Sequence, residues 1–92
     1  MSAVVDRLNL LLDLEKVKMP WLEQKTGIKA GKWHKVRRRE NEMKTSELEA
    51  IAQVWPEYAY WLTTGLELPA AGQISPMTKW EQQRSQTPPA AG

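Results

Sequence analysis

Lysine and arginine are the residues of this sequence with the clearest chemical use, and most of them fall in one stretch. Residues 16–44 contain ten Lys or Arg and three acidic residues, a net charge of +7, whereas the rest of the chain carries −5 of the total of +2. A concentrated positive field attracts polyanions, because Lys and Arg neutralise phosphates and release their counterions. The stretch therefore indicates a polyanionic partner, with a solvated helix face rich in lysine as the alternative.

Catalytic and metal chemistry find little support in the same sequence. The chain has one histidine, His34, and no cysteine, so it can form neither disulfides nor thiolate metal sites. It also has no glycine-rich phosphate loop and no pair of carboxylates placed to face a cleft. We therefore expect no enzyme activity, no metal and no cofactor.

The sequence also lacks the features of a membrane or exported protein. No apolar run reaches the roughly 20 residues that a membrane span requires. The first residues, Met-Ser-Ala-Val-Val-Asp-Arg, lack the basic region and apolar stretch of a signal peptide. Because the absence of cysteine suits a reducing compartment, we expect a cytoplasmic protein without a membrane partner.

Five short helices follow from the spacing of the apolar residues, which recur every three or four positions. Pro20 suits only a first helical turn, and Gly27 readily takes the left-handed conformation that ends a helix. Ser46 with Glu49 matches a capping box. The predicted helices span residues 2–17, 19–26, 29 or 30 to 38, 45–55 and 56–64. We therefore expect an all-α fold, a compact five-helix orthogonal bundle.

Residues 66–92 differ in composition from residues 1–65. They hold four of the six prolines, and Gln, Ser and Ala fill much of the rest. Ser75-Pro76 can start a short helix over residues 76–84, and the last six residues are expected to be disordered. The sequence thus predicts a folded domain over 1–65, followed by a loosely ordered tail.

The two predicted helices around Gly27 coincide with the charge maximum. Two short helices joined by a tight glycine turn can hold the second one in a major groove about 12 Å wide. Four apolar residues are expected to seal the inner side of the pair: Leu22, Ile28, Trp33 and Val36. For the side chain of Trp21, the sequence leaves open whether it is buried or half-exposed. This coincidence predicts a DNA-binding helix-turn-helix whose second helix lies within residues 29–39.

Four segments carry a resemblance to a known family: Leu-Glu-Gln-Lys-Thr-Gly-Ile at 22–28, Trp33 with Val36, Leu-Glu-Ala-Ile-Ala at 48–52 and Trp-Leu-Thr-Thr-Gly at 61–65. In this order they resemble the lambda-repressor-like (Xre/Cro-type) helix-turn-helix family over about two-thirds of the chain. Members of that family usually bind operator DNA as dimers. The resemblance implies that this chain binds double-stranded DNA and forms a homodimer.

The resemblance also implies which residues contact the DNA. Base contacts fall on Ala30, Gly31, Lys32 and Lys35, with His34 adjacent. From charge, the phosphate contacts are Lys18, Lys29, Arg37, Arg38, Arg39 and Lys44, although some of the arginines can instead pair with Glu40 and Glu42. The family usually has a small residue where Glu23 stands, so Glu23 must turn to solvent or the packing must differ. Because Ala30 and Gly31 replace long polar side chains, phosphate contacts and DNA shape are expected to carry much of the recognition.

The sequence thus predicts a sequence-specific transcriptional regulator, a phage or prophage type of repressor that binds a palindromic operator as a dimer. The candidate dimer contacts are Tyr58, Trp61, Leu66, Leu68, Ile74 and Trp80. One alternative is an antitoxin that binds DNA and holds a toxin protein through its tail. Another is a protein-interaction adaptor that has lost DNA binding.

Overall fold

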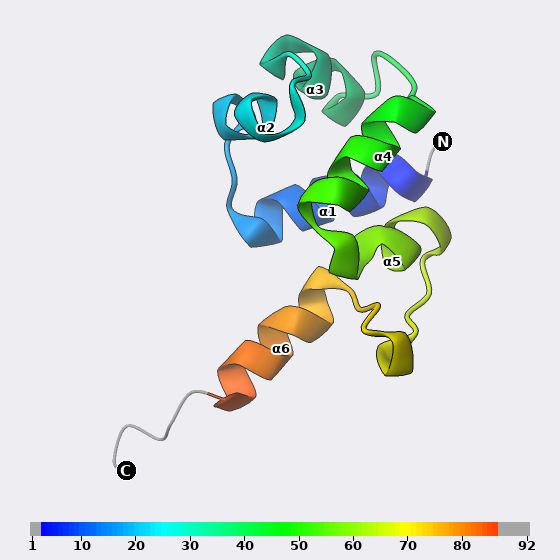
Figure 1. The fold of residues 1–92 in the computed structure, drawn as a ribbon. Coiled ribbons are helices and arrows are strands. Elements are labelled where there is room, and N and C mark those ends of the chain that lie inside the picture. Colours follow the sequence, from blue (N-terminus) through cyan, green and yellow to red (C-terminus); the bar gives the residue numbers. More distant parts are fainter. Residues whose placement is uncertain (1–2, 87–92) are drawn as a thin grey trace.

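The structure, a computed structural model, describes residues 3–86, and this part of the chain is built from helices. The α-helices are α1 (Ala3–Glu15), α2 (Met19–Thr26), α3 (Ala30–Arg37), α4 (Thr45–Val54), α5 (Ala59–Thr64) and α6 (Pro76–Gln86). Two 3-10 turns, η1 (Pro56–Tyr58) and η2 (Pro69–Ala71), precede α5 and α6. Extended pairing within residues 3–86 is limited to an isolated bridge between Leu68 and Gln73. The all-α prediction is confirmed: the described residues form six α-helices, and α6 lies where the sequence predicts a short helix in the tail (Figure 1).

Two predicted helices differ clearly from the structure, whereas α3 and α4 each end one residue earlier than predicted. α1 ends at Glu15 rather than at residue 17, because Lys16 adopts the left-handed conformation with φ 58°. Residue 2, the predicted start of that helix, lies outside the described residues. The predicted helix 56–64 is divided into η1 and α5. A 3-10 turn advances each residue by a different angle from an α-helix, so η1 changes which side chains of this segment face inward.

The capping box predicted from Ser46 and Glu49 is wrong. α4 begins at Thr45, earlier than that pattern requires, so the residue before the helix is Lys44. A lysine side chain has no acceptor for the free N–H groups of a first turn. The buried carboxylate of Glu47 instead accepts the backbone N–H of Lys44 at 2.6 Å.

One hydrophobic core lies inside the body, by which we mean α1–α5 together with η1. Its buried side chains are Val5, Leu8, Leu11, Leu12, Met19, Leu22, Trp33, Val36, Ile51, Trp55, Tyr58, Trp61 and Leu62. Trp33 and Tyr58 are the largest fully buried side chains. The chain has no Phe, so tryptophan and tyrosine provide the aromatic part of this core.

Arg7 of α1 closes the C-terminal end of α5. Its Nε donates to the carbonyl of Leu62 at 2.8 Å, and its Nη2 donates to the carbonyl of Thr63 at 3.2 Å. These carbonyls lie in the last turn, where a helix leaves its acceptors unpaired. Gly65 then ends the helix with φ 81°, and a Cβ at this position would lie 3.2 Å from Nη1 of Arg7. The end of α5 is therefore fixed both by its backbone and by α1.

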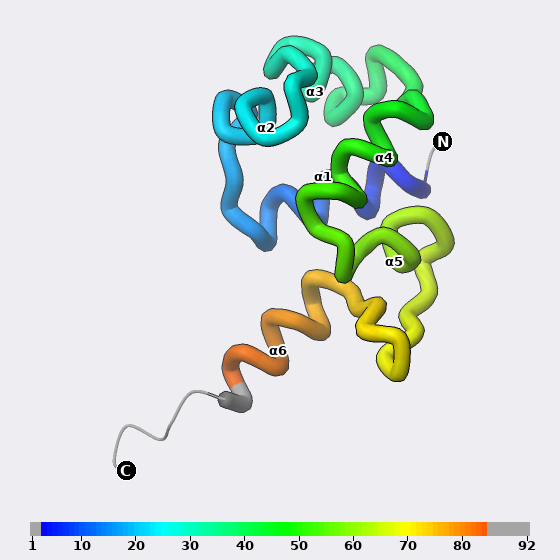
Figure 2. Tube along the Cα trace, in the orientation of Figure 1, coloured from blue at the N-terminus to red at the C-terminus, as the bar shows by residue number. Residues whose placement is uncertain are grey.

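α6 projects from the body (Figures 1 and 2). Ser75 caps its first turn, since Ser75 Oγ accepts the backbone N–H of Thr78 at 3.1 Å. An ion pair between Lys79 and Glu57, at 2.7 Å, attaches this turn to the body. Further along the helix, Trp80 is 47% exposed. α6 occupies the residues for which the sequence predicts a short helix, and it stands out from the body rather than adding to the core.

The segment between Gly65 and α6, predicted to be part of a loosely ordered tail, makes hydrogen bonds to the body. Ile74 N–H donates to the carbonyl of Glu57 at 2.9 Å, and the side-chain oxygen of Gln73 accepts the backbone N–H of Tyr60 at 2.9 Å. The last six residues, 87–92, for which disorder is predicted, lie outside the described part of the chain.

Candidate nucleic-acid interface

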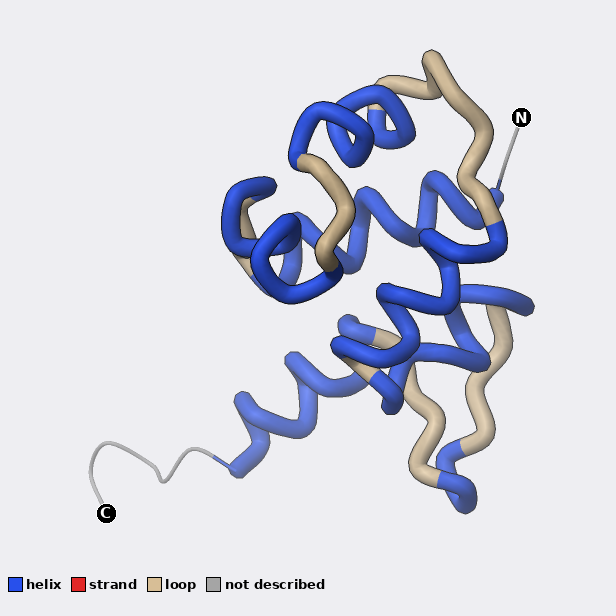
Figure 3. Tube along the Cα trace, turned by 45° about the horizontal axis from the view of Figure 1, so that its top comes forward, coloured by secondary structure: helices blue, strands red, loops and turns tan. Residues whose placement is uncertain are grey.

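A short turn of residues 27–29 joins α2 to α3 (Figure 3). Gly27 ends α2 in the left-handed conformation, with φ 74°. The hydroxyl of Thr26 donates to the carbonyl of Leu22 at 2.7 Å. The same hydroxyl accepts the backbone N–H of Ile28 and the indole N–H of Trp33, both at 3.2 Å. One side chain therefore links the last turn of α2, the connecting turn and α3.

α3 has a buried face and an exposed face. Trp33 and Val36 are buried in the core together with Leu22, as the apolar spacing predicts, and Ile28 packs partly buried against them. The predicted base contacts Gly31, Lys32 and Lys35, together with His34, are exposed, whereas Ala30 is half-buried. The arrangement leaves the polar side of a short helix open to solvent over a firm apolar support.

The first amide of α3 is capped by a residue of α2. Lys29 precedes the helix and its side chain makes no capping hydrogen bond. The carboxylate of Glu23 accepts the backbone N–H of Ala30 at 2.7 Å, from a residue seven positions earlier. Glu23 therefore neither turns freely to solvent nor disturbs the packing. Two signals for this were present in the sequence: a carboxylate where the family has a small residue, and a lysine at the position that should cap.

The last turn of α3 is held by two residues of α1. Asn9 Nδ2 donates to the carbonyl of Arg37 at 3.2 Å, while Nε of the Arg37 side chain donates to Asn9 Oδ1 at 2.7 Å. The guanidinium also pairs with Asp13 at 2.7 Å, and the Arg37 side chain is only 24% exposed. The predicted phosphate contact Arg37 is thus occupied in joining α3 to α1.

The other two arginines of the run are also paired, but at the surface. Arg38 pairs with Glu40 at 2.8 Å, as the sequence allowed, and Arg39 pairs with Asp6 of α1. All four side chains are at least 42% exposed. Exposed ion pairs of this kind stabilise a protein by about 0–1 kcal/mol, so they can be exchanged for a stronger anionic partner.

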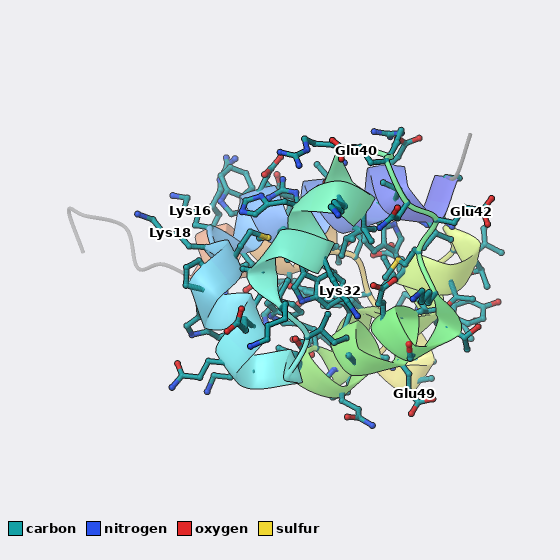
Figure 4. The ribbon with its side chains drawn as sticks, turned by 90° about the horizontal axis from the view of Figure 1, so that it is seen from above. Lys16, Lys18, Lys32, Glu40, Glu42 and Glu49 are labelled. Carbon is teal, nitrogen blue, oxygen red and sulfur yellow. The ribbon has the colours of Figure 1, made fainter. Side chains whose placement is uncertain are left out.

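The lysines around α3 make no ion pair among residues 3–86, and they are exposed: Lys18, Lys29, Lys32, Lys35 and Lys44. Figure 4, which views the molecule from the side of α2 and α3, shows Lys32 near the middle of the view and Lys16 and Lys18 at one edge. Glu40, Glu42 and Glu49 lie toward the other margins. Of the labelled side chains, a lysine therefore lies nearest the middle of this surface and the three glutamates lie nearer its margins.

Trp21 lies half-exposed at the side of α2. Its ring centroid is 5.8 Å from that of Trp55, in a tilted arrangement, and the Lys25 ammonium lies 5.6 Å from the Trp21 ring. These rings line an open hollow together with residues 15–18. Trp21 therefore covers the edge of the core, and one of its faces is in contact with a cation.

Two of the candidate dimer contacts, Tyr58 and Trp61, are corrected by the structure. Tyr58 is fully buried and Trp61 is 5% exposed, because η1 turns both side chains toward the core. The hydroxyl of Tyr58 donates to Glu15 at 2.5 Å, and burial together with this neighbouring carboxylate raises the pKa of the tyrosine. Of the remaining candidates, Ile74 packs against the core, whereas Leu66, Leu68 and Trp80 are 61%, 47% and 47% exposed.

The described residues offer neither a metal-binding cluster nor a membrane-spanning helix. Within 3–86, no group of three or more His, Asp or Glu side chains could hold a metal ion. No described helix has the length and apolar character needed to cross a membrane. On the exposed side of α3, Lys32 and Lys35 carry hydrogen-bond donors and no acceptor, which suits them to binding an anion.

The chain is similar to a solved structure of a phage protein. No protein-family model matches the chain, and no curated protein matches it either. Among solved structures, it is similar to Pf6r from the filamentous phage Pf6 of Pseudomonas aeruginosa PA01, with 33% sequence identity and a TM-score of 0.70. The match covers 82% of this chain and 96% of Pf6r. The similarity therefore extends over nearly the whole of that protein.

Proposed function

We propose that this chain, which belongs to the same protein family as Pf6r of the filamentous phage Pf6, is a non-enzymatic, DNA-binding regulator of transcription of the phage-repressor type. In this proposal α2 and α3 form a helix-turn-helix of the lambda-repressor type, and α3 enters the major groove. The observation that carries the proposal is the α3 surface: exposed lysines that make no ion pair within residues 3–86 lie opposite the buried Trp33 and Val36. A helix held on one side and cationic on the other suits contact with phosphates and base edges.

The base contacts are assigned to the exposed face of α3. Lys32 and Lys35 are three residues apart and so share a face of the helix, and lysine can donate to O6 and N7 of guanine. Ala30 can contact a thymine methyl group, and Gly31 allows the backbone to approach the bases closely. His34 is exposed beside them and is assigned a base or phosphate contact.

The phosphate contacts are assigned to residues around this face. The first choice is three exposed lysines that make no ion pair in the described part of the chain: Lys18, Lys29 and Lys44. Arg38 and Arg39 can join them by exchanging their surface ion pairs for phosphates. Arg37 is omitted, because its side chain is engaged by Asn9 and Asp13.

The proposed active form is a homodimer on a palindromic operator, with half-sites about 34–36 Å apart. The exposed Leu66, Leu68 and Trp80 supply apolar surface for a second copy. Trp80→Ala should then lower the average mass measured by analytical ultracentrifugation, whereas Gln82→Ala on the same helix should leave it unchanged. An unchanged dimer in the Trp80 variant would place the interface elsewhere.

The projecting α6 favours a second candidate, an antitoxin-type protein that binds DNA and also holds a toxin. Met77 and Trp80 are 40% and 47% exposed on this helix, which suits contact with a protein. An antitoxin should restore growth of cells that express a toxin from the adjacent gene, and Trp80→Ala should weaken that rescue. Growth that is restored equally by the variant would contradict a role for α6.

The proposed function is tested by selection from random double-stranded DNA, followed by binding titrations at two salt concentrations. We expect an enriched palindrome bound with a Kd of about 10⁻⁸–10⁻⁹ M, and an affinity that falls steeply as salt is added. Lys32→Ala and Lys35→Ala should relax the base preference, whereas Lys18→Ala should weaken binding to all DNA alike. A selection that enriches no sequence would contradict the regulator. A chain without salt-dependent DNA binding would instead be an interaction adaptor.

A further inference from the structure

The two ends of α3 are held by polar side chains from two different helices, Glu23 of α2 and Asn9 of α1. We propose that these are positioning residues, which fix where α3 places the side chains that contact the bases. Losing them should reduce discrimination between DNA sequences more than it reduces the general affinity for DNA. The inference rests on the proposed function, since it names what sets the selectivity of that same surface.

At the start of α3, the contact is short and charged. Glu23 Oε1 lies 2.7 Å from the backbone nitrogen of Ala30, and Lys29 supplies no cap of its own. A carboxylate on a backbone N–H is a charge-assisted hydrogen bond, and it also lies at the positive end of the helix dipole. The first turn of α3 is therefore attached directly to α2.

At the other end, Asn9 makes a double contact with one residue. Its amide group donates to the backbone carbonyl of Arg37 and accepts from the Arg37 side chain, at 3.2 and 2.7 Å. Asp13 completes the arrangement with an ion pair to the same guanidinium at 2.7 Å. Because both the backbone and the side chain of Arg37 are engaged, the last turn of α3 is attached to α1.

The residues assigned to base contacts lie between these two attachments. α3 has eight residues, which is about 12 Å of helix, so Gly31, Lys32 and Lys35 are each within one turn of an anchored end. Trp33 and Val36 fix which side of α3 faces the core, whereas the end contacts limit its sliding and tilting. A displacement of about 1 Å breaks a hydrogen bond to a base edge.

Binding to phosphates depends much less on such a displacement. Lysines neutralise phosphates through their charge, and this part of the affinity is independent of sequence. A base contact is directional and discriminates by about 1–3 kcal/mol. Loosening an end of α3 should therefore reduce the ratio of affinities for selected and random DNA, and should leave binding to random DNA intact.

The test compares Glu23→Ala with Glu23→Gln in the full-length protein. Both variants lose the same negative charge near the DNA, but glutamine retains a side-chain oxygen that can accept the Ala30 N–H. We expect both to bind random DNA somewhat more tightly than the wild type. Glu23→Ala should lower the ratio of affinities about fivefold or more, whereas Glu23→Gln should stay within about twofold of the wild type.

Asn9→Ala provides an independent measurement at the other end, and it keeps the inference testable if Glu23→Ala does not fold. It should lower the same ratio, while Asn41→Ala, on the connection after α3, serves as a surface control that leaves the ratio unchanged. A ratio unchanged in both Glu23→Ala and Asn9→Ala, or an equal loss in Glu23→Gln and Glu23→Ala, would overturn the positioning role. A wild-type protein that selects no DNA sequence would overturn the proposed function and this inference together.

Discussion

α3 and α4 both begin after a lysine, and at the start of each helix a glutamate accepts a backbone N–H, but the two glutamates come from different places. In α4, Glu47 of the first turn accepts the N–H of Lys44 at 2.6 Å. In α3, Glu23 of another helix accepts the N–H of Ala30 at 2.7 Å. The start of α4 is thus determined within four consecutive residues, whereas the start of α3 requires α2 to be in place.

The difference shows two uses of the same hydrogen bond. A cap from within a helix stabilises that helix wherever it lies, since the interaction moves with it. A cap from a neighbouring helix is made only in one relative placement, so it stabilises the placement as well as the helix. The internally capped helix belongs to the scaffold, and the externally capped one carries the proposed DNA contacts.

The largest effect is expected from removing the apolar support under α3. Trp33→Ala deletes a fully buried indole and its hydrogen bond to Thr26, and it should lower the free energy of unfolding by about 3–5 kcal/mol. Trp21→Ala, at a site that is 38% exposed, should cost much less. Urea denaturation measures both variants. Similar losses in the free energy of unfolding for the two variants would contradict the view that burial of Trp33 in the core is the main stabilising contact of α3.

The comparison between the two caps predicts a separation of stability from selectivity. Glu47→Ala should lower the free energy of unfolding by about 1–2 kcal/mol, because α4 loses its cap. The ratio of affinities for selected and random DNA should remain that of the wild type, unlike the ratio for Glu23→Ala. If Glu47→Ala reduced this ratio as much, the distinction between an internal and an external cap would be lost.

Gly31 allows stability and DNA binding to change in opposite directions. A Cβ at this position would meet nothing within 4 Å, so the protein itself does not require glycine here. Gly31→Ala should raise the free energy of unfolding by about 0.5–1 kcal/mol, because alanine loses less backbone entropy in a helix. It should also weaken binding to the selected DNA, roughly tenfold if the backbone approaches a base closely. Unchanged binding would show that the first turn of α3 does not contact DNA.

The smallest effect is expected at a third helix start, that of α6. Glu67 accepts the backbone N–H of Ser75 at 2.6 Å, and hydrogen bonds from Thr78 and Ser75 lower the pKa of this carboxyl. A carboxyl with a lowered pKa stabilises the fold above its ordinary pKa, and the contribution disappears as the pH falls through the lowered value. The wild type should therefore melt at a higher temperature than Glu67→Gln at about pH 6, and this difference should shrink as the pH is lowered to about 3. A constant difference across this range would contradict the assignment.

Much of the fold was predictable from local signals. The bounds of α2 match the prediction at both ends, because Pro20 and Gly27 restrict the backbone whatever surrounds them. The buried positions Leu22, Trp33 and Val36 follow from helical spacing. The all-α class is confirmed for the same reason: each of the helices shows its own apolar periodicity.

The sequence did not reveal contacts between distant residues, nor two local changes in the backbone. Asn9 and Arg37 are 28 positions apart, and no single-sequence pattern records that they meet. The assignment of Tyr58 and Trp61 to a dimer interface did not anticipate their burial, because η1 interrupts the helical phase between α4 and α5. The left-handed Lys16 that ends α1 was equally unpredictable, since lysine has no special preference for that conformation.

The contact of Arg7 with the end of α5 has a consequence for the order of folding. It joins residues that are 55 and 56 positions apart, and Asn9 and Asp13 reach α3 from the same helix. The first described helix of the chain therefore completes its polar contacts only after most of the sequence has been synthesised. Contacts between such distant residues slow folding, because a long loop must close before they form. A chain that stops before α5 would leave α1 without the acceptors for Arg7, so α1 is synthesised well before its contacts with α5 can form.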